Sequence, residues 1–86
     1  MTQTKLERLQ IIFDRDHGTS CEGWYVRMRE QSTAARQGQE IDEPVDVAIP
    51  EDPTSERQQA TLRGEARRVA RANGYHVPSS LAVEIL

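Results

Sequence analysis

The segment over residues 54–74 constrains the fold of this chain most, because it carries helix signals at both ends. Ser55, followed three residues later by Gln58, has the form of a capping box, in which a side-chain oxygen accepts from a free backbone N–H. At the other end stands Gly74, and glycine adopts the left-handed turn that ends many helices. The sequence therefore predicts one main helix over residues 55–73.

The predicted helix has an apolar face and a basic face. Apolar residues recur at helical spacing at four positions, Leu62, Ala66, Val69 and Ala70. Arg63, Arg67 and Arg71 are spaced four residues apart on another face, with Arg57 and Arg68 beside them. The apolar face is expected to pack on a sheet, which leaves the arginines as a charged surface.

Two β-strands are predicted before the helix. Residues 6–14 alternate in part between apolar and polar, and the apolar cluster at 11–13 favours extended structure over a helix ending at Gly18. Residues 23–30 alternate clearly, with Trp24, Val26 and Met28 on one face and Tyr25, Arg27 and Arg29 on the other. The turn-rich segment between the two runs predicts a β-hairpin.

A third short strand is predicted over residues 45–49, which alternate between apolar and polar or small side chains. Pro44 and Pro50 bracket this strand, and this favours an edge position because proline has no N–H for a ladder. Residues 31–43 are polar and acidic, and we expect them to form a flexible loop.

The C-terminal residues 79–86 allow two structures. Ser79 or Ser80 can cap a short helix, whereas the alternation of Leu81, Val83 and Ile85 is typical of a strand. The helix is slightly favoured.

The whole chain, residues 1–86, is therefore expected to be a single small α+β domain. Its predicted core is a small antiparallel sheet of about three strands packed by one main helix, with a short C-terminal helix or strand. Gly64 inside the helix costs about 1 kcal/mol relative to alanine. It marks either a close approach to the sheet or a tolerated weak position.

Charge is distributed unevenly along the chain, although the net charge is only −3. Residues 37–54 carry no Lys or Arg, and we expect an acidic surface there that includes Glu40, Asp42, Glu43 and Asp46. Residues 55–74 carry five arginines and two glutamates. This distribution indicates either two binding faces of opposite sign or loose pairing of the acidic segment with the helix arginines.

Several classes of protein are not expected from this sequence. Cys21 is alone, so an internal disulfide cannot form. No run of 18 apolar residues and no secretory signal pattern is present in the sequence. We therefore expect a cytoplasmic protein.

Few residues have the chemistry of catalysis or metal binding. The predicted hairpin turn gathers the chain's best candidates, which are Asp14, Asp16, His17, Cys21 and Glu22. Their spacing matches neither a zinc pattern nor a calcium loop, and such residues are typical of polar turns. His76 is more simply interpreted as a partly buried side chain that bonds to the backbone. We predict no enzyme activity, no metal site and no cofactor.

Arginine provides the stronger functional signal, because its guanidinium group binds carboxylate or phosphate through two parallel hydrogen bonds. Two basic surfaces are predicted to bind a partner, and they comprise Arg63, Arg67, Arg71 and Arg68 on the helix and Tyr25, Arg27 and Arg29 on the sheet. The edge strand at 45–49 is also suited to pairing with a strand from another protein.

A short stretch resembles a known family. Residues 11–16, an apolar run ending in Asp-Arg-Asp, are followed by Gly-Trp-Tyr-Val at 23–26. This is similar to the start of small antitoxin domains of the HicB type. The resemblance implies a partial ribonuclease-H-like sheet and action by binding a toxin. It covers about a quarter of the chain, and the 31–43 loop and third strand depart from that pattern, so the prediction of function does not depend on it.

The sequence as a whole predicts a small non-enzymatic protein-binding module, a regulator or inhibitor that docks on a larger protein. Its small size favours an origin in a phage or mobile element. The alternative is a nucleic-acid-binding protein, in which sheet residues read bases and helix arginines contact phosphates. The acidic middle segment disfavours this alternative, because it repels the phosphate backbone.

Overall fold

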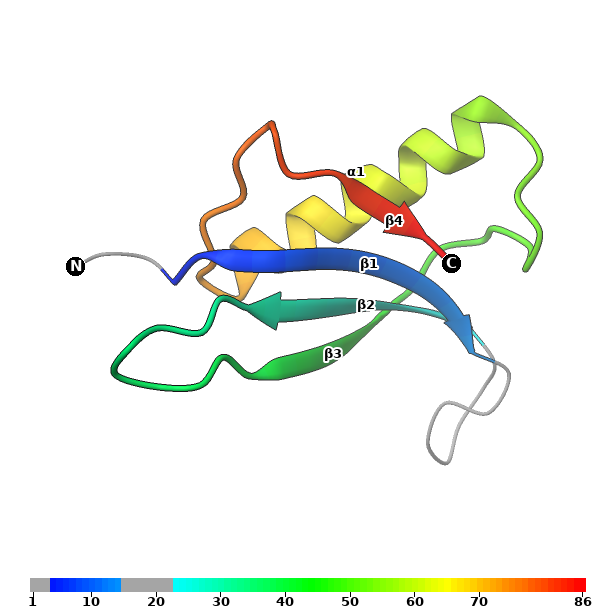
Figure 1. Cartoon of the computed structure of the whole chain (residues 1–86). Helices are drawn as coiled ribbons and strands as arrows, with labels where there is room; N and C mark the ends of the chain where they lie inside the picture. The colour runs from blue at the N-terminus through cyan, green and yellow to red at the C-terminus, as the bar shows by residue number, and fades with distance from the viewer. Residues whose placement is uncertain (1–3, 15–22) are drawn as a thin grey trace.

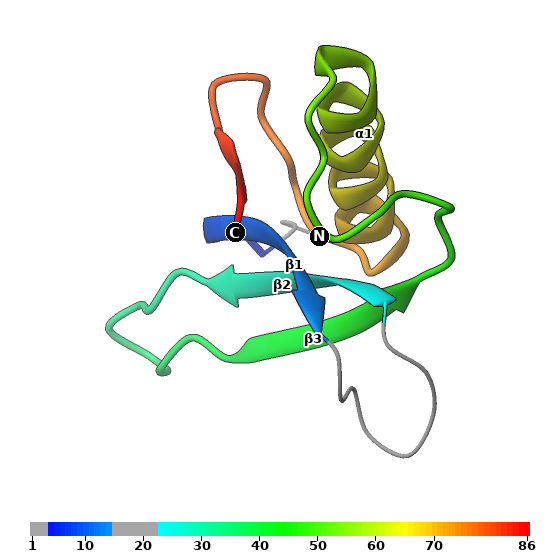
Figure 2. The ribbon, with the colours of Figure 1, turned by 90° about the vertical axis from the view of Figure 1, so that its right-hand side faces the viewer.

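A computed structural model describes residues 4–14 and 23–86. The described chain forms one four-stranded sheet with a single helix over one face (Figures 1 and 2). The elements in chain order are β1 (Leu6–Asp14), β2 (Gly23–Glu30), β3 (Glu40–Val45), α1 (Glu56–Ala72) and β4 (Val83–Ile85). The strand order is β3-β2-β1-β4, in which β4 is parallel to β1 and the other neighbours are antiparallel. The predicted α+β class is confirmed.

The main helix forms where its end signals predict it. The Ser55 hydroxyl oxygen accepts from the backbone N–H of Gln58 at 3.0 Å, and Gly74 takes a φ of +87° after the last turn. The buried face of α1 is the predicted one, consisting of Leu62, Ala66, Val69 and Ala70. A Cβ at Gly64 would meet nothing within 4 Å, so this glycine does not mark a close approach to the sheet.

The core lies between α1 and one face of β1 and β2. Fully buried side chains at its centre include Leu9, Ile11, Val26, Met28 and Leu62. Trp24, Val26 and Met28 point to this core. Tyr25 is also buried, but it lies outside the core cluster on the other face, where Arg29 is exposed. The predicted division of β2 into two faces is therefore confirmed.

The third strand starts earlier than predicted. β3 spans Glu40–Val45, so it begins inside the stretch predicted as a loop, and residues 46–49 lie beyond its hydrogen-bonded ladder. The physical reason is the pairing across strands, since Arg29 and Arg27 of β2 lie opposite Glu40 and Asp42. Opposite charges at directly facing positions of two strands stabilise their register. The alternation within one segment does not reveal such a pairing with another strand.

Pro44 lies within β3 and not before it, but the edge position was predicted correctly. The backbone N–H of Glu30 donates to the carbonyl oxygen of Gln39 at 2.8 Å. The backbone groups of Gln39 therefore face β2, and in an antiparallel pair those of every second residue do the same. Pro44 is five residues further on, so its backbone groups face the outer side, where a missing N–H costs little.

Residues 31–39 connect β2 to β3 as an exposed loop with its own hydrogen bonds. The hydroxyl oxygen of Thr33 accepts from the backbone N–H groups of Ala35 and Arg36 at 3.3 and 3.2 Å. The flexibility expected of this loop stays a prediction.

The slightly favoured C-terminal helix is wrong, and the strand alternative holds. Val83–Ile85 forms β4 beside β1, and the backbone N–H of Leu86 donates to the carbonyl oxygen of Ile11 at 3.0 Å. Without β4, this edge of β1 would leave its hydrogen-bonding groups unpaired, and a strand there also buries Val83 against the core.

Candidate functional site

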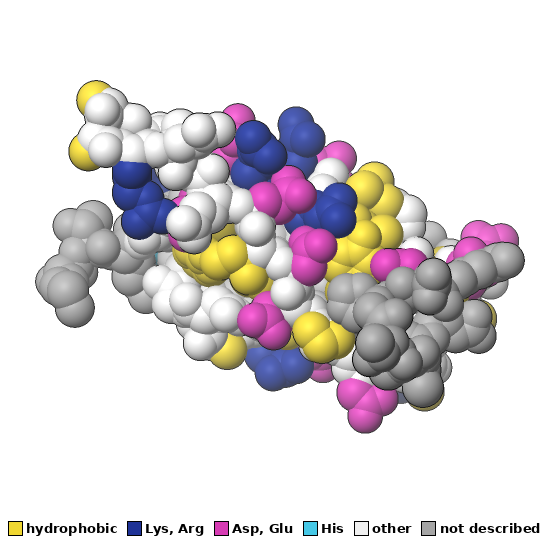
Figure 3. Space-filling view, turned by 90° about the horizontal axis from the view of Figure 1, so that it is seen from below, with side chains coloured by type: hydrophobic (Ala, Val, Ile, Leu, Met, Phe, Trp, Pro, Cys, Tyr) yellow, Lys and Arg dark blue, Asp and Glu magenta, His cyan; other side chains and the backbone are white. Residues whose placement is uncertain are grey.

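The sheet face opposite α1 carries arginines that are paired with carboxylates inside the molecule. Arg27 binds Asp42 through two hydrogen bonds, from Nε to Oδ1 at 3.0 Å and from Nη2 to Oδ2 at 3.2 Å. Arg29 donates to Glu40 at 3.2 Å and lies 3.4 Å from a carboxylate oxygen of Glu7. Figure 3 shows basic and acidic side chains interspersed over this face. The arginines of this face are therefore paired with carboxylates and do not form a continuous basic patch.

Tyr25 belongs to the same cluster. The Arg27 guanidinium lies 5.4 Å from the centre of the Tyr25 ring and donates to its hydroxyl at 3.2 Å. The hydrogen bonds to Asp42 raise the pKa of Arg27, whose guanidinium is protonated at neutral pH in any case. The predicted triad of Tyr25, Arg27 and Arg29 is therefore brought together, but as a paired structure.

The predicted helix stripe separates into arginines with partners and arginines without them. Arg67 donates to the carbonyl oxygens of Pro78 and Leu81 at 3.3 and 2.8 Å, and so holds the segment that leads to β4. Arg68 forms an ion pair with Glu65 at 2.6 Å. Within residues 4–14 and 23–86, no ion pair is formed by the exposed side chains of Arg57, Arg63 and Arg71.

The acidic surface is divided in a similar way. Glu40 and Asp42 are engaged by β2, whereas Glu43 is half-buried, Asp46 is exposed, and neither has an ion pair among the described residues. Glu40 and Asp42 pair with arginines of β2. The alternative in which the acidic segment pairs with the helix arginines is therefore wrong for these two residues.

Glu30, a buried acidic residue that is only 6% exposed, was not among the site residues predicted from the sequence. It accepts from the Tyr75 hydroxyl at 2.7 Å, from Arg36 at 2.6 Å and from the backbone N–H of Gln39 at 3.1 Å. The sequence did indicate that Glu30 is buried, because it continues the inward-facing series of alternate residues in β2, but it did not indicate the partners of the carboxylate.

These contacts shift the ionisation of both buried groups. The pKa of Glu30 is lowered, mainly by the hydrogen bond from Tyr75 and next by the one from the backbone N–H of Gln39, although burial acts in the opposite direction. Burial, helped by the same carboxylate, raises the pKa of Tyr75 to about 12. A fully hydrogen-bonded acid with a lowered pKa is suited to holding structure together, and not to proton transfer near neutral pH.

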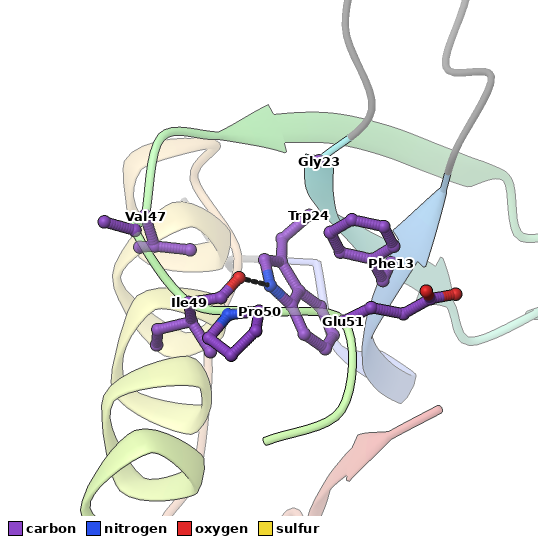
Figure 4. Close-up of a pocket in the computed structure, with 8 residues that line it drawn as sticks. Phe13, Gly23, Trp24, Val47, Ile49, Pro50 and Glu51 are labelled. Atoms are coloured by element: carbon purple, nitrogen blue, oxygen red, sulfur yellow. Dashed lines mark hydrogen bonds between the residues drawn. The ribbon is translucent and has the colours of Figure 1, made fainter.

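Beyond β3, residues 46–50 form an extended segment, here named the strap, that runs toward the start of α1 (Figure 1). The Trp24 indole N–H donates to the carbonyl oxygen of Ile49 at 2.9 Å (Figure 4). The Phe13 ring meets Trp24 edge-on, with centroids 5.4 Å apart. The hydrogen bond anchors the strap to the end of the sheet, and the ring contact packs the side of Trp24.

Hollows lie on both sides of the strap. On the sheet side, a cavity of about 570 Å³ is lined by Phe13, Gly23, Trp24, Val47, Ala48, Ile49, Pro50 and Glu51. On the helix side, a groove of about 300 Å³ is lined by Val47, Ala48, Ile49, Arg57, Gln58 and Thr61. Among the described residues, the strap is not paired as a strand with either neighbour.

No group of three or more His, Cys, Asp or Glu side chains that could hold a metal ion occurs in the described residues. Of the five candidates in the hairpin turn, Asp14 ends β1 and the other four lie outside the described residues. His76 is exposed, and the prediction that it is partly buried is wrong. The reason is that its backbone forms the contact, through a β-bridge to Lys5, while the side chain stays exposed.

Comparison of the chain with family models, curated proteins and solved structures gave no match. In the part of the chain that the structure describes, α1 is neither long nor apolar enough to cross a membrane.

Proposed function

We propose that the chain is a small non-enzymatic protein-binding module that docks the exposed face of α1 onto an acidic surface of a larger protein. One observation carries the proposal: Arg57, Arg63 and Arg71 have no ion-pair partner among the described residues. The other six arginines of the described chain each bind a carboxylate or a backbone carbonyl, so the arginines without an ion pair are all on one helix.

Unpaired arginines favour docking for an energetic reason. A guanidinium that already holds a carboxylate must break that pair before it binds another protein, whereas an unpaired one exchanges only water. Electrostatic attraction of this kind also accelerates the encounter of two proteins, mainly at low ionic strength.

Nucleic-acid binding is the second candidate, favoured by the same three arginines because guanidinium also binds phosphate. The sheet face weighs against it. Arg27 and Arg29, which would have to read bases, lie beside Asp42 and Glu40, and these carboxylates repel a phosphate backbone.

A docking module acts by occupying a surface of its partner, so we propose the role of a regulator or inhibitor. The lone cysteine supports a reducing compartment, and we place the protein in the cytoplasm. The small size supports an origin in a phage or mobile element.

The test is a pull-down from a host lysate with wild-type protein and with the Arg63→Glu/Arg71→Glu variant, followed by mass spectrometry. We expect specific protein partners that the double variant loses and that rise in yield as salt is lowered. Lys5→Glu/Arg8→Glu is the charge control, because it changes the net charge equally at exposed positions away from α1. Its only cost within the described residues is the exposed Arg8–Glu84 pair at 3.7 Å. Equal capture by both double variants would overturn the proposal.

The same variants decide the second candidate. A salt-sensitive gel shift of duplex DNA or RNA that only the helix variant loses would replace protein docking by nucleic-acid binding. We expect no shift at low salt.

A further inference from the structure

We propose that the groove between the strap and the first turns of α1 binds an extended segment of the partner protein, with a carboxylate of that segment on Arg57. This inference rests on the proposed function and adds where the partner inserts and what it inserts. The occupant is a short strand of the partner, with an apolar side chain next to one acidic residue.

The backbone of the strap is the first argument. Its side chains alternate between half-buried and exposed, as in a strand, yet residues 46–50 have no backbone–backbone hydrogen bond in the described structure. The strap also continues directly from β3, an edge strand. An extended segment with unpaired N–H and C=O groups is a template for a strand from another protein.

The direction of these groups favours the helix side. In extended chain the N–H and C=O groups of successive residues point to opposite sides. The carbonyl of Ile49 points to Trp24, so the N–H and C=O of Ala48 point away from the sheet end. A strand in the groove can therefore form a pair of main-chain hydrogen bonds with Ala48.

The groove has room and a suitable lining. Its volume of about 300 Å³ is many times what one water molecule needs, so side chains of an inserted segment can enter it. Val47 and Ile49 are half-buried, and their apolar atoms gain from contact with an apolar side chain of the occupant.

Arg57 supplies the charge preference. Its exposed guanidinium lines the groove and forms no ion pair with any described residue. The Thr61 hydroxyl is occupied, because it donates to the backbone carbonyl of Arg57 at 3.0 Å. Asp46 and Asp52 are exposed nearby in sequence, so a segment with one carboxylate is favoured over a strongly acidic one.

The experiment is an NMR titration of the ¹⁵N-labelled full chain with two probe peptides. One is acetyl-Thr-Val-Asp-Val-Thr-amide, and the other has lysine in place of aspartate. We expect the aspartate peptide to shift the amides of residues 47–49 and the side-chain Nε–H of Arg57. We expect the lysine peptide to bind about tenfold more weakly, a difference of about 1.4 kcal/mol.

Two variants test the two arguments separately. Arg57→Gln is expected to remove the preference for aspartate while leaving the shifts at residues 47–49. Ala48→Pro removes the N–H and is expected to abolish binding, whereas Ala48→Ser keeps the N–H and serves as its control. Amide shifts of the core outside residues 45–50 report whether each variant remains folded.

The outcomes separate this inference from the proposed function. No shift of residues 47–49 at millimolar aspartate peptide, or shifts confined to other surfaces, would overturn the groove as the binding site. In that case a pull-down that still depends on Arg63 and Arg71 would leave the docking function standing.

Discussion

Strand β2 carries two arginine–carboxylate clusters that use the same chemistry in different surroundings. At its end, Glu30 is buried and bound by Arg36, Tyr75 and a backbone N–H. Along its outer face, Arg27 and Asp42 form a bidentate pair with about a third of each side chain exposed. The difference in burial leads us to expect that burial, more than the number of hydrogen bonds, decides how strongly the free energy of unfolding depends on each cluster.

The buried cluster joins segments that are far apart in the sequence. Tyr75 follows α1, Glu30 ends β2, and Gln39 precedes β3, so one carboxylate connects the helix end to the loop between two strands. The outer cluster only joins neighbouring strands that the backbone ladder already holds.

The largest expected effect is that of Glu30→Ala. The change leaves the Tyr75 hydroxyl and the Gln39 N–H without an acceptor, and each unsatisfied buried donor costs about 1–3 kcal/mol. We expect the free energy of unfolding to fall by about 3 kcal/mol in urea denaturation. Glu30→Gln keeps an acceptor and should lose clearly less. Equal losses for both variants would show that the charge, and not satisfaction of the donors, is decisive.

Alkaline pH is expected to weaken the same cluster. Because the pKa of Tyr75 is raised to about 12 in the folded state, above about 10 in the unfolded chain, its contribution is complete below pH 10 and is lost as pH rises toward 12. We expect a loss of about 2 kcal/mol across this window, measured by urea denaturation at several pH values. The Tyr75→Phe variant should lack this part of the pH dependence.

Acid acts through Glu30 in the opposite direction. Since its pKa is lowered in the folded state, its contribution is present above the unfolded value of about 4.3 and is lost as pH falls further. A pH profile of Glu30→Gln that still paralleled wild type below pH 4 would contradict this assignment.

Gly38 is expected to be essential to the loop that surrounds the cluster. A Cβ at this position would run into the backbone carbonyl of Glu30. Relief of the clash requires the loop to move away from β2, so Gly38→Ala should destabilise by about 1–2 kcal/mol, measured by thermal or urea unfolding.

Gly64→Ala is the matched control. The added methyl group meets nothing within 4 Å, and alanine is the better helix former, so this variant should gain up to about 1 kcal/mol. Loss of stability in both variants would indicate that glycine is needed at each position for a reason other than the space around it.

Local signals were sufficient for much of the fold, and contacts between distant segments explain the rest. Ser55 and Gly74 predict α1 because a helix cap depends on residues within one turn. β4 could not be predicted in the same way, because its pairing partner β1 is some 70 residues away and the local pattern allows two structures. The start of β3 likewise depends on Arg29 and Arg27 of another strand.

The candidate sites follow the same rule. Alternation in β2 predicts that Tyr25, Arg27 and Arg29 share a face, and the structure agrees. Spacing in the helix does not show that Arg67 is occupied by the carbonyls of Pro78 and Leu81, because those residues return to the helix only in the folded chain. The Glu30–Tyr75 bond, across 45 residues, is equally hidden from the sequence.

The smallest expected effect concerns the outer cluster. A double-mutant cycle of Arg27→Ala and Asp42→Ala should give a coupling free energy of about 0.5–1 kcal/mol in urea denaturation. The pair is partly exposed, so each charge is resolvated when its partner is removed, and added salt should reduce the coupling further. A coupling as large as the loss in Glu30→Ala would mean that this face is dry in the folded protein. Its arginines would then be unavailable to any partner, and α1 would remain the basic surface for docking.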